Sequence, residues 1–174
     1  TSLAFGSYGI KQGFNNLGAA CAENGMLEEA RGYFEQALTL DAAYRTALSN
    51  LAKVFASMRK WADAKKTLKR LLDLDPKNHD ARMQLVTILR QSGQGHAAVF
   101  ELEKLAKDEP KNVDILVLAG DISMESGDSL MALTYYQRAL TLDSSRFDLL
   151  EKIQRLLEVQ AGGAGYGNDP FSST

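Results

Sequence analysis

AVFELEKLAKDEP, residues 98–110, is the stretch that decides the fold, because its spacing returns three more times along the chain. The same pattern appears in ARGYFEQALTLDA (30–42), AKKTLKRLLDLDP (64–76) and ALTYYQRALTLDS (132–144). The four segments begin with alanine at positions 30, 64, 98 and 132, so each step is 34 residues without insertion. Such a strict period is the signature of a repeat protein whose stacked units bury a shared core.

Each repeat is predicted to contain two helices. In the first repeat, Phe14, Leu17, Gly18 and Cys21 follow the i, i+3, i+4, i+7 spacing of an amphipathic helix. Gly25 ends this helix, because glycine adopts the left-handed C-cap conformation without strain. A second amphipathic segment follows in every repeat and ends at a turn, so each repeat is expected to form a helix-turn-helix unit.

The period also sets the predicted organisation of the chain. It defines repeats at 11–44, 45–78, 79–112 and 113–146, within a repeat domain at 11–160. Residues 147–160 are predicted to form a capping helix whose charged side chains solvate the end of the stack. Residues 1–10 are expected to be an irregular or part-helical lead-in rather than a helix, and 161–174 a glycine-rich tail. Two interpretations of the tail stay open: a linker, or a docking peptide containing Tyr166, Pro170 and Phe171.

Composition limits the class of protein. The 174 residues are 45% hydrophobic and 24% charged with a formal net charge of −2, as in one soluble globular or repeat domain. No apolar run approaches the roughly 18 residues of a membrane span, and the start does not resemble a signal peptide. With a single cysteine, Cys21, no internal disulfide is expected. We expect a cytoplasmic protein, with a periplasmic location or a tether through a missing segment left open, since the chain opens on Thr1.

These features resemble the tetratricopeptide repeat (TPR) family. Its 34-residue pattern places leucine and a small residue in the first helix, then alanine, an aromatic residue, alanine and proline in the second helix and its exit. The match covers residues 11–146, with departures at Arg82, Val86 and Ser123. The resemblance implies an all-α, right-handed superhelix (an α-solenoid) of four helix-turn-helix units and a C-terminal capping helix.

The resemblance also implies that the first helices line a concave groove that binds peptides or proteins. The groove positions are the second, fifth, sixth, ninth, twelfth and thirteenth of each repeat, and Gln91 is among them. The candidate partner-binding residues are Asn15, Asn16, Asn50, Lys53, Met83, Gln84, Thr87, Arg90, Asp114, Val117, Leu118, Asp121, Met124 and Glu125.

Carboxamide side chains recur at one groove position. Asn16, Asn50 and Gln84 are each sixth in their repeat, which predicts a row of groups able to pair with both the C=O and the N–H of a peptide. The alternative is that they only solvate an exposed helix face. Asn50 also fits the carboxylate clamp by which some members of the family hold chaperone tails, but the clamp's basic positions hold Asn15, Ala19, Asp80 and Gln84 here. A chaperone-tail adaptor is therefore not expected.

The groove of the later repeats combines apolar and acidic side chains. Met83, Val117, Leu118 and Met124 suggest apolar anchoring of a partner, unless these side chains turn into the core. The neighbouring acidic groove residues favour a partner with some positive charge.

Charge is distributed unevenly along the repeats. Residues 45–78 hold nine Lys and Arg against three Asp and Glu, whereas the first and fourth repeats each have a net charge of −3. A candidate convex basic patch consists of Lys65, Lys66, Lys69 and Arg70, with Arg59 near it. Its interpretations are a solvated face, an acidic partner, or self-association with the acidic repeats. Nucleic acid is not expected, because no aromatic residues are interleaved with the patch.

Sequence signals for catalysis are poor. His79 and His96 lack cysteine or carboxylate neighbours at metal-ligand spacing. We predict no catalytic residue, metal or cofactor, and expect a non-enzymatic interaction scaffold that binds a peptide or protein segment in its groove. The alternatives are a self-assembling homo-oligomeric scaffold, or the adaptor arm of a larger signalling or pilus and envelope-assembly protein.

Overall fold

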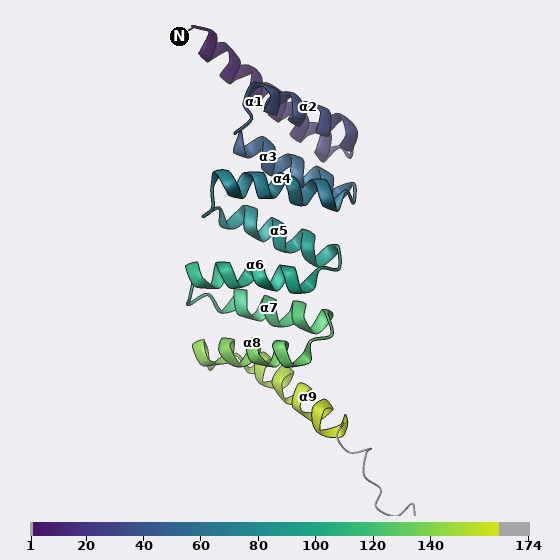
Figure 1. The fold of residues 1–174 in the computed structure, drawn as a ribbon, viewed down its shortest axis with the longest axis vertical. Coiled ribbons are helices and arrows are strands. Elements are labelled where there is room, and N and C mark those ends of the chain that lie inside the picture. Colours follow the sequence, from purple (N-terminus) through teal and green to yellow (C-terminus); the bar gives the residue numbers. More distant parts are fainter. Residues whose placement is uncertain (1, 164–174) are drawn as a thin grey trace, which may run out of the picture. The chain divides into compact units, whose positions relative to one another are not determined.

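The computed structural model describes residues 2–163, apart from the side chains of residues 2–5, 7–8 and 160–163. The regular structure of this part is entirely α-helical (Figure 1). The helices are α1 Ser2–Glu23, α2 Leu27–Leu40, α3 Arg45–Ser57, α4 Trp61–Leu74, α5 His79–Gln91, α6 Gly95–Asp108, α7 Val113–Glu125, α8 Ser129–Leu142 and α9 Phe147–Gly163. The predicted all-α repeat fold is confirmed.

The helices fall into two compact units, Thr1–Gln94 (unit 1) and Gly95–Thr174 (unit 2). The boundary lies inside the third predicted repeat, so α5 belongs to unit 1 and α6 to unit 2. The predicted capping helix continues three residues beyond 160, to Gly163. The proposed docking peptide of the tail lies outside the described residues.

The expectation of an irregular lead-in is wrong, because α1 begins at Ser2 and runs unbroken to Glu23. Gly6, Gly9 and Gly13 reduce the helix propensity of this segment. Unlike proline, however, glycine keeps its backbone N–H and does not clash with the preceding turn. Three isolated glycines therefore weaken the helix without ending it.

Unit 1 is built by packing each helix against the next. The first helices also contact one another, α1 with α3 and α3 with α5. One core cluster joins α2 to α3 through residues such as Phe34 and Leu51, and another joins α3 to α4 and α5 through Leu48, Leu68 and Ile88. Every helix thus completes the core of its neighbour, as expected for a repeat protein.

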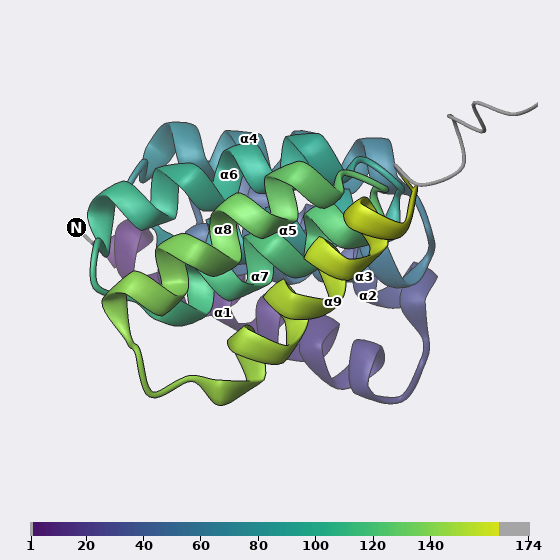
Figure 2. The ribbon, with the colours of Figure 1, turned by 90° about the horizontal axis from the view of Figure 1, so that it is seen from below.

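Unit 2 follows the same plan, with α6 on α7, α7 on α8, and α9 beside α8 (Figure 2). Leu102, Ile122 and Tyr136 are almost completely buried. Helix α9 contributes Leu149, which is fully buried, and Leu156 to this core. Ser123, which replaces the aromatic residue of the family pattern, is also buried, and its hydroxyl donates to the Ala119 carbonyl oxygen at 2.8 Å.

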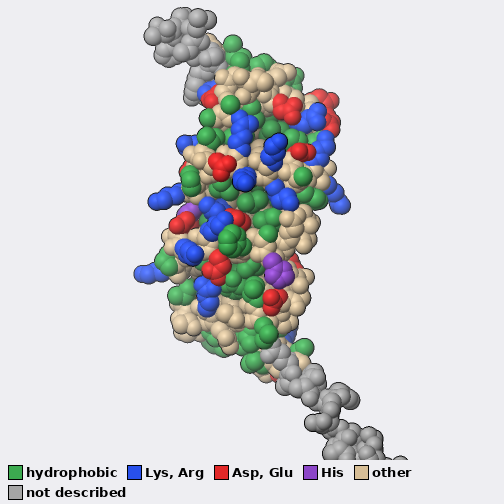
Figure 3. Space-filling view, in the orientation of Figure 1, with side chains coloured by type: hydrophobic (Ala, Val, Ile, Leu, Met, Phe, Trp, Pro, Cys, Tyr) green, Lys and Arg blue, Asp and Glu red, His purple; other side chains and the backbone are tan. Residues whose placement is uncertain are grey.

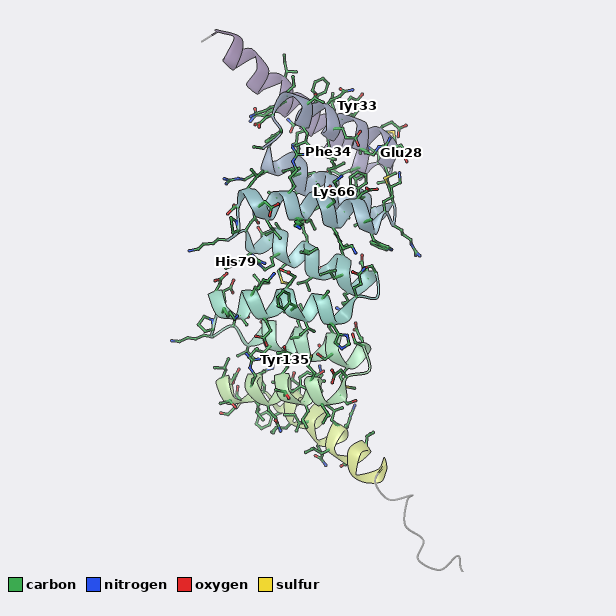
Figure 4. The ribbon with its side chains drawn as sticks, in the orientation of Figure 1. Glu28, Tyr33, Phe34, Lys66, His79 and Tyr135 are labelled. Carbon is green, nitrogen blue, oxygen red and sulfur yellow. The ribbon has the colours of Figure 1, made fainter. Side chains whose placement is uncertain are left out.

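In the first and fourth repeats, a glycine in the first helix lies against an aromatic residue in the second. A Cβ atom added to Gly18 would lie 2.7 Å from Cε1 of Phe34, and one added to Gly120 would lie 2.4 Å from Cε1 of Tyr136. Figure 4 labels Phe34 on α2. In the second repeat the position of these glycines is held by Ala52. The position of the aromatic residues is held by the smaller Leu68, which belongs to the same core cluster. The sizes of the two side chains therefore compensate for each other.

The turn between the two helices is the same in all four repeats. The second residue after the first helix donates to the carbonyl three residues back, and the third residue donates to the carbonyl five residues back, which is the Schellman motif. Its left-handed position is held by Gly25, Gly93 and Gly127, with φ of 76°, 74° and 79°. In the second repeat the position is held by Arg59, with φ of 56°.

The size compensation at the helix crossing predicts a non-additive mutant pair. Gly18→Ala should destabilise unit 1, because the overpacking cost of about 1–3 kcal/mol exceeds the roughly 0.5–1 kcal/mol gained in helix propensity. Adding Phe34→Leu recreates the Ala52 and Leu68 combination and should recover part of that loss. Urea unfolding of the two single variants and the double variant measures the coupling, expected to be on the order of 1 kcal/mol. Strictly additive free energies would contradict the compensation.

Candidate functional site

A cavity of about 620 Å³ opens in unit 1 between α3 and α5, beside the turn that leads into α4. Its wall combines apolar groups with long polar side chains. It is lined by Lys53, Ala56, Ser57, Arg59, Trp61, Gln84, Thr87, Ile88 and Gln91.

The cavity brings together three of the candidate partner-binding residues: Lys53 from α3, and Gln84 and Thr87 from α5. Gln91, another groove position, joins them. Because α3 and α5 contact each other, positions 34 residues apart in the sequence become neighbours on one face.

The sequence analysis did not predict the other five lining residues, which are Ala56, Ser57, Arg59, Trp61 and Ile88. Arg59 had been grouped with the basic patch on the outer helix, but the structure places it at the cavity. A signal was present in the sequence, because the corresponding position of the other three repeats is glycine.

Two cations of the cavity have no ionic partner. Within the described residues, neither Lys53 nor Arg59 forms an ion pair, and both side chains are exposed. Other cations of the same repeat are paired: Arg45 lies 3.5 Å from a carboxylate oxygen of Asp75, and Lys60 lies 3.3 Å from one of Glu28. The cavity therefore carries positive charge that no described side chain neutralises.

The predicted carboxamide row also serves the stack itself. Asn50 Nδ2 donates to Asn15 Oδ1 at 3.2 Å, and Gln84 Nε2 donates to Ser49 Oγ at 2.8 Å. Each of these bonds joins neighbouring first helices, while Asn16 is exposed. Gln84 Oε1 is buried and accepts no hydrogen bond from the described residues.

Two acidic groove residues of unit 2, Asp114 and Asp121, are paired with cations of the same unit. Asp121 accepts hydrogen bonds from the Tyr136 hydroxyl and from Lys152 Nζ, both at 2.6 Å. Asp114 lies 3.3 Å from the guanidinium of Arg146. A basic partner would have to compete with these cations.

The remaining predicted groove residues do not gather into one cavity of the described structure. Met83, Val117 and Leu118 are half-buried, whereas Met124 is 40% exposed. Arg90 and Glu125 are exposed. The apolar strip is thus only partly available to a ligand.

Lys and Arg side chains gather on the face of unit 1 shown in Figure 3. Within the predicted basic patch, Lys65 Nζ donates to Gln94 Oε1 at 3.0 Å, and the Arg70 guanidinium donates to the Ala42 carbonyl oxygen. Lys66, labelled on α4 in Figure 4, and Lys69 are exposed. The exposure of these two lysines fits a helix face that only contacts water, and it equally fits a surface that binds an acidic partner.

Among residues 2–163, no group of three or more His, Cys, Asp or Glu side chains is arranged to hold a metal ion. None of the described helices combines the length and the hydropathy needed to cross a membrane.

Models of the tetratricopeptide repeat match residues 22–87 and 57–115, and a further one matches residues 113–146. The chain belongs to the tetratricopeptide repeat family. These matches cover the cavity and the helices that line it. No curated protein sequence matches the chain.

Several solved TPR structures share the fold at low sequence identity. MamA superposes with a TM-score of 0.71 at 17% identity, covering 87% of this chain and 83% of that one. YrrB, described as a TPR protein with an unusual peptide-binding site, gives 0.63 at 19% identity, covering 85% and 76%. PilF of Pseudomonas aeruginosa gives 0.64 at 19% identity, covering 90% and 72%. At these identities the likeness shows the fold alone.

In unit 2, an ionic cluster beside the buried Tyr135 links α6 to α8. Glu103 lies 2.7 Å from the Arg138 guanidinium and is hydrogen-bonded to Tyr135, labelled in Figure 4. Burial by itself raises the pKa of Glu103, but the hydrogen bonds from Arg138 and Tyr135 outweigh it and hold the pKa below its usual value. Burial and the bond to Glu103 raise the pKa of Tyr135.

The lowered pKa of Glu103 predicts how acid affects stability. The cluster contributes fully above the unfolded-state pKa of about 4.5 and loses its contribution as the pH falls through the lower folded-state value. Urea midpoints measured from pH 7 downward should therefore converge for wild type and Glu103→Gln once the pH has fallen below the lowered folded-state pKa of Glu103. Glu151→Gln, at an exposed site on α9, is the control. A constant difference between wild type and Glu103→Gln at all pH values would contradict the assignment.

Proposed function

We propose that the protein is a non-enzymatic interaction scaffold that binds a peptide segment of a partner in the cavity between α3 and α5. The observation that carries this proposal is the convergence of Lys53, Gln84 and Thr87 on one cavity. All three residues hold groove positions that the resemblance to the TPR family implies.

The size and lining of the cavity suit a peptide. Its volume of about 620 Å³ falls in the range of roughly 300–1,000 Å³ that is usual for ligand sites. Trp61, Ala56 and Ile88 supply apolar surface, and Gln84 and Gln91 supply amide groups that can pair with a peptide backbone.

The likeness to YrrB supports the same type of activity. That protein is described as having an unusual peptide-binding site, and its fold superposes on most of this chain. A TPR protein of this fold can therefore bind peptides through a site that is not the usual one. The cavity described here, which lies beside the turn that leads into α4, is consistent with such a site.

Substitutions at two matched threonines, one at the cavity and one outside it, test whether peptides bind in the cavity. Thr87 on α5 and Thr134 on α8 are both exposed, and each hydroxyl donates to the carbonyl four residues back at 3.0 Å. Tyrosine at position 87 would fill the cavity, whereas tyrosine at position 134 would not. Peptides selected by the full chain from a displayed library of random dodecapeptides should bind Thr87→Tyr at least about tenfold more weakly, by fluorescence anisotropy. Thr134→Tyr should bind like wild type.

Failure to enrich any peptide would contradict the proposed function. Enriched peptides that bind Thr87→Tyr as tightly as wild type would place the site elsewhere. Circular dichroism of both variants establishes that neither substitution has unfolded the protein.

Self-association through the ends of the stack is a second candidate function. The outer helices expose large apolar side chains: Ile10 and Leu17 on α1 are 53% and 49% exposed, and Leu150 and Leu157 on α9 are 44% and 47% exposed. The α9 residues lie seven apart, on one helix face. Adding a further repeat unit end to end would bury such residues. Use of the chain as an adaptor arm of a larger assembly is compatible with either candidate.

The double variant Leu150→Lys and Leu157→Lys tests self-association. If the ends associate, light scattering after size exclusion should show a mass above one chain for wild type and one chain for the variant. Peptide binding in unit 1 should be unchanged. A single-chain mass for wild type at all concentrations would remove this candidate.

A further inference from the structure

We propose that the cavity selects acidic segments, with Arg59 as its principal contact for a carboxylate and Lys53 as the second. The inference rests on the proposed function and adds the chemical class of the ligand. Among the four described turns within repeats, Arg59 stands where the other three have a left-handed glycine.

Arg59 has a left-handed backbone conformation, which is unfavourable for a residue that carries a Cβ atom. A left-handed conformation costs a residue other than glycine roughly 1–2 kcal/mol. The three equivalent turns avoid this cost with Gly25, Gly93 and Gly127, while their hydrogen bonds are the same. The turn itself therefore gives no reason for arginine, and strain of this kind commonly marks a functional position.

The place of the arginine supplies the reason. Arg59 lines the cavity together with Lys53, and neither forms an ion pair with a described residue. A turn without a side chain at this position would leave only one cation at the cavity. A guanidinium gives two parallel hydrogen bonds to a carboxylate, which makes Arg59 the stronger of the two contacts.

The remaining walls restrict how an acidic side chain can bind. Trp61 and Ile88 contribute apolar surface next to the cations, where a charge-assisted hydrogen bond is less weakened by water than on an open surface. The basic residues Lys66 and Lys69 on α4 do not line this cavity. The ligand is therefore expected to recognise the cavity and not the basic patch.

The site also differs from the family's carboxylate clamp. Lys53 is at the ninth position of its repeat and Arg59 is in the turn, whereas two of the clamp's basic positions correspond to Asp80 and Gln84 in this sequence. The acidic preference follows from a different set of residues.

The test uses the full chain and the displayed library of random dodecapeptides. The enriched peptides should be rich in Asp and Glu, and their affinity should fall as salt is raised. Arg59→Gly should weaken binding by about tenfold or more, the effect of losing a charge-assisted contact. The same substitution should leave the protein at least as stable to urea, because glycine relieves the left-handed strain. Arg59→Lys should retain part of the binding.

Lys69→Ala provides the matched control, since it removes an exposed cation of the same repeat outside the cavity. Loss of binding in Arg59→Gly with unchanged or higher stability, and normal binding in Lys69→Ala, would support the inference. Enriched peptides without acidic residues, or unchanged binding in Arg59→Gly, would overturn it while leaving the proposed function in place. No enrichment at all would instead contradict the proposed function.

Discussion

The close crossing of the two helices in a repeat is the constraint on which the rest of the structure depends. At Gly18 and Gly120 the facing aromatic rings of Phe34 and Tyr136 lie so near that there is no room for a Cβ atom. At Ala52 the facing residue is leucine. Because interiors are close-packed, the sum of the two side-chain volumes has to suit the crossing. The helix pair is thereby fixed as a unit that the next helix can cover.

The same packing explains where a binding site can form. In unit 1 the first helices contact each other, and hydrogen bonds from Asn50 to Asn15 and from Gln84 to Ser49 join them. Side chains at equivalent positions therefore line one face. The turn after α3 then adds Arg59 to that face. A cationic cavity results from elements whose main role is to hold the stack together.

The sequence was sufficient for most of the fold because a 34-residue period with glycine at the turns has few structural solutions. The lead-in was mispredicted because three glycines lowered the local helix propensity without a proline to end the helix. For the site, the resemblance to the family implied that Lys53, Gln84 and Thr87 face one groove, and these three residues line one cavity. The repeat positions could not show that Asn50 and Asp121 use much of their hydrogen-bonding capacity inside the protein. Such pairings depend on side-chain geometry between helices, which a periodic pattern does not contain.

We propose that the partner binds the face formed by α3 and α5, which the strained Arg59 completes. Amide and indole NMR signals of the full chain, followed during titration with an enriched peptide, are the sharpest test of this site. The largest shifts are expected at Lys53, Arg59 and Gln84 and at the Trp61 indole. Shifts concentrated at Lys66 and Lys69 on α4, or in α7 of unit 2, would contradict the proposal.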